Sequence, residues 1–232
     1  MDAAMPDLAA RIDFIRETTR PIDVAGVPGV RLYQADEVTP LWLMTEETMA
    51  SRQLAPPFWA FAWAGGQALA KYLLDHPETV RGKRVLDIAC GSGLVGVAAM
   101  KAGAARVVCN DIDPYAEAAV GLNARLNGVD IAFLGGDLLD GPAPDADLVM
   151  AGDVTYEKSM SASMLSYFRR AARDKIEVLI GDPHRGYFPR DAGLKKLADY
   201  IISTHADIED AREEPASVWK LEADHEQDAP HH

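Results

Sequence analysis

The chain has 232 residues, 48% of them hydrophobic, and a formal net charge of −13. These values predict one globular domain, or one domain with an extension. No apolar run reaches the ~18 residues of a membrane span, and the acidic start does not resemble a signal peptide or an organelle presequence. The negative charge disfavours nucleic acid as a partner and favours a basic protein surface or a cationic side chain.

The two cysteines, Cys90 and Cys109, fall at the ends of predicted strands. This position indicates reduced, buried thiols, as in a cytoplasmic protein, and disfavours a disulfide. The six histidines are scattered, and no Cys/His cluster has the spacing of metal ligands, so we expect no metal site. We expect a cytoplasmic monomer without a membrane partner.

The first 55 residues are predicted to form an N-terminal extension. Apolar positions at helical spacing predict a helix from about Pro6 to Arg20, and Val30–Tyr33 reads as a strand. The segment Leu41–Met44 fits either a strand or a helix. An aromatic loop, Pro56–Trp63, ends the extension and leads into the main domain.

Residues 56–222 are predicted to form the main domain, and the polar residues 223–232 a disordered tail. From Lys83 onward strands and helices alternate, which predicts a parallel sheet with helices on both faces. Two final apolar segments, Tyr200–Ser203 and Ser217–Leu221, have no clear helix between them and predict a hairpin at one edge. The other strands are predicted at Arg84–Ile88, Arg106–Cys109, Ile131–Leu134, Ala146–Ala151 and Lys175–Ile180, and the helices at about Gly65–Leu74, Leu94–Ala102, Pro114–Asn127, Lys158–Arg173 and about Ala192–Leu197.

The most informative segment is the strand Arg84–Ile88, which has Asp87 near its end and is followed by a glycine turn. Gly91, Gly93 and Gly96 satisfy G-x-G-x-x-G, a pattern that is weak evidence by itself. A dinucleotide would place its pyrophosphate at this turn, and Asp87 would repel it. The same acid suits the ammonium group of S-adenosylmethionine, so the pattern D-x-x-x-G-x-G favours that cofactor over NAD.

Two more acids follow the next two strands. Asp111 ends the second strand and is placed to accept hydrogen bonds from a ribose diol, with Ile112 beside it. Asp137, followed by Leu138, lies at the third strand-to-loop junction and is placed to accept from the adenine amino group. Each acid alone reads as a loop carboxylate or a helix cap. Three acids at successive strand ends favour a cofactor site.

The fourth strand is followed by Asp153 and Tyr156 in the spacing D-x-x-Y. Ligands of doubly wound sheets lie beyond the carboxyl ends of the strands, near the switch point. Both side chains are therefore predicted to face the transferred methyl group and to be catalytic. The alternative is a helix N-cap with an exposed tyrosine.

With the glycine turn, this D-x-x-Y element resembles the seven-strand protein-lysine methyltransferases. The segments Pro57–Leu69, Asn110–Pro114 and Leu179–Pro183 are similar to the electron transfer flavoprotein beta-subunit lysine methyltransferases, and the resemblance runs from about Ile12 to Trp219. It implies an α/β fold with a Rossmann-like, seven-stranded class I sheet, S-adenosylmethionine as cofactor and the flavoprotein beta subunit as protein substrate.

In that family the aromatic-Gly-Gly stretch lines the cofactor site, so the resemblance implies that Trp63 contacts the cofactor. Core packing is the alternative for this side chain. Ala64 departs from the proline expected after the tryptophan. The missing mitochondrial presequence implies a bacterial relative.

Three other functions compete with lysine methylation. A nicotinamide-like small amine is an alternative acceptor that the residues alone do not dismiss. An NAD-dependent oxidoreductase is disfavoured by Asp87, and a non-catalytic cofactor-binding module by the D-x-x-Y element.

Overall fold

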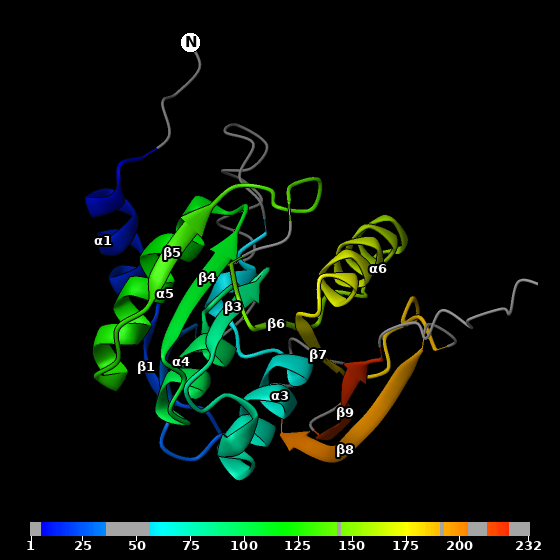
Figure 1. Ribbon diagram of the computed structural model, residues 1–232. Helices are drawn as coiled ribbons and strands as arrows, with labels where there is room; N and C mark the ends of the chain where they lie inside the picture. The colour runs from blue at the N-terminus through cyan, green and yellow to red at the C-terminus, as the bar shows by residue number, and fades with distance from the viewer. Residues whose placement is uncertain (1–5, 36–55, 143–144, 191–192, 204–212, 223–232) are drawn as a thin grey trace, which may run out of the picture.

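A computed structural model describes residues 6–35, 56–142, 145–190, 193–203 and 213–222 (Figure 1). The ambiguous segment Leu41–Met44 and the predicted tail lie outside these residues. In the described part of the chain, no helix has the length and apolar character needed to cross a bilayer.

A seven-stranded sheet in the order β5-β4-β3-β6-β7-β9-β8 forms the centre of the molecule. The five strands from β5 to β7 run parallel, whereas β9 runs antiparallel to both of its neighbours. This order confirms the predicted Rossmann-like class I sheet and its edge hairpin. The strands are β3 (Arg84–Ile88), β4 (Arg106–Asp111), β5 (Ala132–Gly135), β6 (Leu148–Gly152), β7 (Glu177–Asp182), β8 (Leu194–Ser203) and β9 (Glu213–Leu221).

Helices cover both faces of the sheet (Figure 1). One face packs against α3 (Ala64–Asp75), α4 (Leu94–Lys101) and α5 (Pro114–Asn127), and the other against α6 (Lys158–Arg173). Two short 3-10 turns, η1 (Phe58–Ala60) and η2 (Pro77–Thr79), flank α3.

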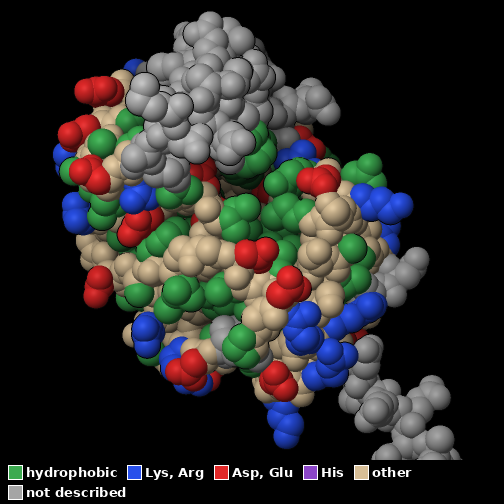
Figure 2. Space-filling model, turned by 90° about the horizontal axis from the view of Figure 1, so that it is seen from above, with side chains coloured by type: hydrophobic (Ala, Val, Ile, Leu, Met, Phe, Trp, Pro, Cys, Tyr) green, Lys and Arg blue, Asp and Glu red, His purple; other side chains and the backbone are tan. Residues whose placement is uncertain are grey.

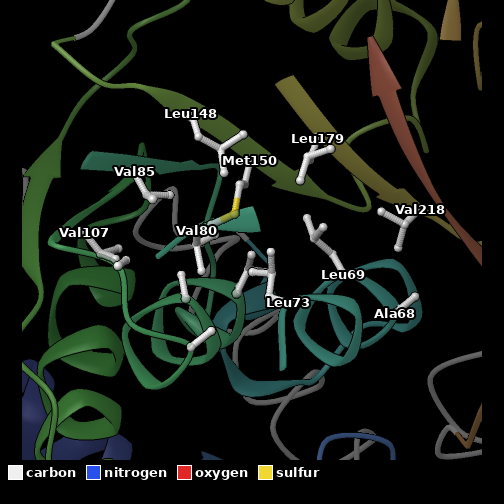
Figure 3. Packing of buried hydrophobic residues seen from close by; sticks show 14 of the residues in the cluster. Ala68, Leu69, Leu73, Val80, Val85, Val107, Leu148, Met150, Leu179 and Val218 are labelled. Atoms are coloured by element: carbon white, nitrogen blue, oxygen red, sulfur yellow. The ribbon is translucent and has the colours of Figure 1, made fainter. Parts of the chain in front are cut away.

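Two apolar layers hold these helices to the sheet. In the first layer Leu69 and Leu73 of α3 meet Met150 and Leu179 (Figure 3). In the second, α6 buries an apolar stripe that includes Phe168 against the opposite face of β6 and β7. Because successive residues of a strand point to opposite faces, the same apolar strands supply both layers.

The described residues 6–35 pack against α5. They include α1 (Leu8–Thr18) and a hairpin of β1 (Arg20–Asp23) and β2 (Arg31–Gln34). In α1, Arg11 pairs with Glu117 at 3.1 Å, and the backbone N–H of Tyr33 donates to Asn123 Oδ1 at 2.7 Å. The predicted first helix and the strand near Val30 are thus present, with β1 as an additional strand.

The helix predicted at about Ala192–Leu197 is wrong, because Leu194 begins a ten-residue strand. The segment Leu194–Tyr200 contains good helix formers, but β8 pairs with β9 from Leu194 to Ser203. Tertiary pairing overrides the local preference here. The described part of the connection from β7 to β8 therefore contains no helix.

Candidate active site

The carboxyl ends of the parallel strands enclose a cavity of about 640 Å³. Figure 2 looks onto this face, where hydrophobic side chains gather at the centre with acidic side chains among them. Gly93 is the one predicted site residue that does not line the cavity; it is the N-cap of α4. The predicted residues that do line it are Trp63, Asp87, Gly91, Asp111, Ile112, Asp137, Leu138, Asp153 and Tyr156.

The glycine turn connects β3 to α4. Gly91 and Gly93 have φ angles of +50° and +74°, a left-handed conformation that favours glycine. The N–H of Gly91 donates to Asp111 Oδ2 at 2.8 Å, and the N–H of Asp113 donates to Asp111 Oδ1 at 2.9 Å. The carboxylate at the end of β4 thus fixes the shape of the turn, while burial raises its pKa.

Asp87 lies beneath this turn and is 1% exposed. Its Oδ2 accepts a hydrogen bond from the N–H of Gly96 at 2.8 Å, and the thiol of Cys109 contacts the same oxygen at 3.6 Å. Burial raises the pKa of Asp87 from 3.8 to about 7. Gly96, the third glycine of the motif, therefore binds the carboxylate of Asp87 and does not line the cavity.

Two free thiols lie beside Asp87. Burial raises the pKa of Cys90, which lines the cavity, well above its ordinary value. Contact with Cys90 lowers the pKa of Cys109, but burial and the nearby acids bring it to about 11. Both cysteines are free, as the sequence predicts.

Aromatic rings form one wall of the cavity. Trp63, the N-cap of α3, donates from Nε1 to the carbonyl of Phe58 at 3.0 Å, and their ring centroids are 5.8 Å apart. Phe58 also lies 5.6 Å from the ring of Tyr156. Phe58 belongs to the aromatic loop that the sequence predicts as part of the wall, although only Trp63 was singled out there as a cofactor contact.

Asp153 lies at the N-terminus of α3. Its Oδ2 accepts from the N–H of Gly66 at 2.9 Å, where the positive end of the helix dipole favours an anion. Its Oδ1 accepts from Arg185 Nη2 at 3.0 Å. With a φ of +56°, Asp153 adopts a backbone conformation that is uncommon outside glycine.

Close backbone packing brings α3 to this acid. A Cβ added at Gly65 would lie 2.4 Å from the carbonyl oxygen of Gly181 and 2.7 Å from Asp153 Oδ2. A Cβ added at Gly181 would lie 2.1 Å from the carbonyl oxygen of Gly65. This contact, the glycine seam of Gly65 and Gly181, lets the helix rest directly on the end of β7.

Sequence reasoning missed Arg185, which lines the cavity in the loop after β7. Its N–H donates to Oδ1 of the fully buried Asp182 at 2.8 Å, and Asp182 Oδ2 accepts from the hydroxyl of Thr155. The available signal was a cation three residues beyond the end of a parallel strand, at the edge where ligands bind.

The charge of the cavity is strongly one-sided. Among the described residues that line it, Arg185 is the only cation, and the acids are Asp87, Asp111, Asp113, Asp137, Asp153 and Glu157. Burial, and then the neighbouring Glu157, raise the pKa of Tyr156, so its phenol stays protonated at neutral pH. Such a lining attracts cations and repels phosphates.

The rim near β4 and β5 combines apolar and acidic groups. Ile112 is 72% exposed, an unusual state for an isoleucine, and Leu138 lies on the same cavity wall. The carboxylate of Asp137 accepts from the N–H of Leu139 at 2.8 Å. Apolar side chains and carboxylates together fit S-adenosylmethionine, which carries a flat base, a ribose diol and an ammonium group.

Comparison with known proteins agrees with this geometry. Residues 68–152 match the family model described as Ribosomal protein L11 methyltransferase (PrmA). A solved structure from Pyrococcus horikoshii, described as an RNA methyltransferase, aligns with a TM-score of 0.55 at 15% identity, over 73% of this chain and 90% of that one. Fold and site together define a class I, S-adenosylmethionine-dependent methyltransferase.

Similar proteins with known names identify the family within this class of methyltransferases. The chain is 39% identical over 171 residues to the electron transfer flavoprotein beta subunit lysine methyltransferase of Xenopus laevis, covering 72% of this chain and 70% of that protein. The Homo sapiens protein of the same name is 37% identical over 168 residues, covering 70% of this chain and 64% of that protein. The chain belongs to the electron transfer flavoprotein beta subunit lysine methyltransferase family.

Proposed function

We propose that this enzyme methylates a lysine side chain on the beta subunit of electron transfer flavoprotein. The observation that carries the proposal is the pair Asp153 and Tyr156, which both line an acid-rich cavity. Relatives at 36–39% identity named for this protein substrate support it. The same names count against the nicotinamide-like small amine.

The cofactor end of the cavity is assigned to the residues after β3, β4 and β5. When bound, S-adenosylmethionine supplies a methyl group on a cationic sulfur that is already an activated leaving group. We assign Asp87 to its ammonium group, Asp111 to the ribose diol and Asp137 to the adenine amino group. Trp63, Ile112 and Leu138 supply apolar surface, and Gly91 and Gly93 shape the turn.

The acceptor end must present a neutral amine. For a lysine of pKa about 10.4, deprotonation at about pH 7.4 costs roughly 4 kcal/mol. Asp153 accepts a hydrogen bond from the amine and orients it, while the phenol of Tyr156 packs against the lysine stem. Positioning supplies much of the rate, and water removes the proton.

We propose that residues 56–222 form the catalytic domain and residues 1–55 an extension of it. The net charge of −13 supports a protein partner over nucleic acid. We further propose a cytoplasmic monomer.

Mass spectrometry of the purified beta subunit, after incubation with enzyme and cofactor, tests the function. We expect mass increments of one or more methyl groups on lysine. Asp153→Asn should reduce turnover by at least about tenfold while calorimetry shows cofactor affinity largely unchanged, because the carboxylate serves the acceptor. An unmodified subunit, alongside efficient methylation of nicotinamide, would transfer the assignment to the small amine.

A further inference from the structure

We propose that Arg185 is a positioning residue that acts through Asp153: by neutralising this carboxylate, it keeps the acceptor lysine from being held in the site as an ammonium ion. The inference rests on the proposed function, because it concerns the amine that Asp153 receives. It adds a role for a side chain outside the sequence motifs of the methyltransferase.

The position of Arg185 is fixed from two directions. Its backbone N–H is held at 2.8 Å by the buried Asp182, which also accepts from Thr155. Its guanidinium reaches Asp153 at 3.0 Å, and the two side chains are only 23% and 9% exposed. An ion pair so shielded from water is screened less than a surface pair, so its charges affect nearby groups strongly.

The cavity needs such a cation because its other charged groups oppose catalysis. A negative charge within ~4–6 Å of an amine favours the ammonium form by about 1–3 pKa units. An ammonium ion has no lone pair and cannot attack a methyl group. Among the described residues, the titratable and charged groups that line the cavity or contact Arg185 are Asp87 and Cys90 at the end of β3, Asp111 and Asp113 at the end of β4, Asp137 after β5, Asp153, Tyr156 and Glu157 after β6, and Asp182 and Arg185 at the end of β7.

Pairing with Arg185 offsets the negative charge of Asp153 but leaves its ability to accept a hydrogen bond. The carboxylate oxygens remain able to accept a hydrogen bond, since each oxygen has more than one lone pair. The net charge of the pair is close to zero, so the pair orients an amine without stabilising its protonated form. A guanidinium is charged at every accessible pH, which makes this compensation constant. His184, the preceding residue, instead contacts Ser217 of β9 at 3.1 Å.

A competing explanation is that Arg185 only ties the loop after β7 to the start of α3. The two explanations differ in their dependence on pH. A loss of loop structure lowers the rate by the same factor at every pH. A loss of charge compensation lowers the rate only where the acceptor is protonated.

The test is kcat against pH, from about pH 6 to about pH 10, with both the beta subunit and S-adenosylmethionine saturating, because kcat reports the ionisation of groups in the bound complex. Arg185→Gln should move the acidic limb upward by about one pH unit, which gives about a tenfold loss near neutrality and recovery towards the wild-type rate in alkali. Arg185→Lys keeps the charge and should retain most of the wild-type profile. Arg190→Gln removes a charge from an exposed position of the same loop, outside the cavity lining, and should change nothing.

Folding of Arg185→Gln is checked by melting and by calorimetry with S-adenosylhomocysteine. If this variant does not fold, Asp153→Asn provides a second test. Asp153→Asn leaves the cation uncompensated, so its acidic limb should move to lower pH even though its maximal rate falls. Parallel profiles in both variants, or a limb that moves in the opposite direction, would overturn the role of Arg185 while the function stands. A wild-type enzyme that leaves the subunit unmodified at every pH would instead refute the proposed function, and the inference with it.

Discussion

We expect the ionisation of Asp87 to make cofactor binding depend on pH. Its pKa of about 7 results first from burial, which the hydrogen bond from Gly96 only partly offsets. Near neutrality the side chain is therefore a mixture of acid and carboxylate. If it faces the cofactor ammonium as proposed, only the carboxylate form binds well.

We expect the dissociation constant for S-adenosylmethionine to rise by about tenfold as the pH falls from about 7.5 to about 5.5, because Asp87 is protonated over that range. The cofactor's own α-amino group, near pKa 7.7–8.0, is mostly protonated at about pH 7.5 and fully protonated at about pH 5.5, so it does not weaken binding as the pH falls. Calorimetry at several pH values measures the effect. Asp87→Asn should bind weakly at every pH, whereas the exposed control Asp140→Asn should behave as wild type. A wild-type affinity independent of pH would remove Asp87 from the ammonium site.

The acids of the site can be predicted from the sequence, whereas the contact between Arg185 and Asp153 cannot. Asp87, Asp111 and Asp153 each follow an apolar strand, and parallel strands bring their carboxyl ends to one edge. Arg185 meets Asp153 across 32 positions of the chain, through a contact that depends on how the loop after β7 folds back. No periodicity or spacing encodes that contact.

At the scale of elements, the glycine seam decides where α3 begins. Its first turn rests against the carbonyl oxygen of Gly181, and from there the N–H of Gly66 reaches Asp153. A displaced helix would weaken both the core and the acceptor end of the cavity. We therefore expect both the stability and the activity of the protein to depend on the contact between Gly65 and Gly181.

We expect Gly65→Ala to lower the free energy of unfolding by at least about 1–3 kcal/mol, since its Cβ would overlap backbone that has no room to move. Methyl transfer should fall with it. Gly121→Ala in α5 is the matched control: nothing lies within 4 Å of the added Cβ, so better helix propensity should stabilise the protein by about 0.5–1 kcal/mol. Chemical denaturation measures both. Equal stability of the two variants would contradict the seam.

The edge hairpin shows where element prediction fails. Lys195, Lys196 and Leu197 favour a helix locally, yet their strand is paired along its length with β9. Among the alternating elements, the strands β3, β6 and β7 were predictable because they are apolar and buried from both faces. An edge strand is buried less, so its sequence is less constrained and less informative.

At the scale of the whole molecule, buried acids set the pH dependence of stability. Burial raises the pKa of Asp113 from 3.8 to about 6 and that of Asp87 from 3.8 to about 7, and it also raises those of Asp111 and Asp182. The stability from such groups is complete below 3.8 and is lost as the pH rises through about 6 to about 7. Repulsion within a chain of net charge −13 grows in the same direction.

The cofactor-free protein should therefore melt several degrees lower at about pH 8 than at about pH 5.5. Asp147 opposes this trend only at lower pH, because its hydrogen bonds with Arg84 lower its pKa to about 2. Calorimetric melting in buffers of equal ionic strength measures the difference. S-adenosylmethionine should raise the melting temperature more at about pH 7.5 than at about pH 5.5, and a melting temperature that increases steadily towards alkaline pH would contradict the account.

The two protonated thiols beside the glycine turn make the protein convenient for optical experiments. Maleimides react with thiolates, and at neutral pH Cys90 and Cys109 supply almost none. A cysteine introduced at the exposed position of Arg190 would thus accept a fluorophore selectively, with both native cysteines left in place. The emission of that dye, a few residues along the loop from Arg185, would report in real time when a lysine-bearing partner reaches the cavity.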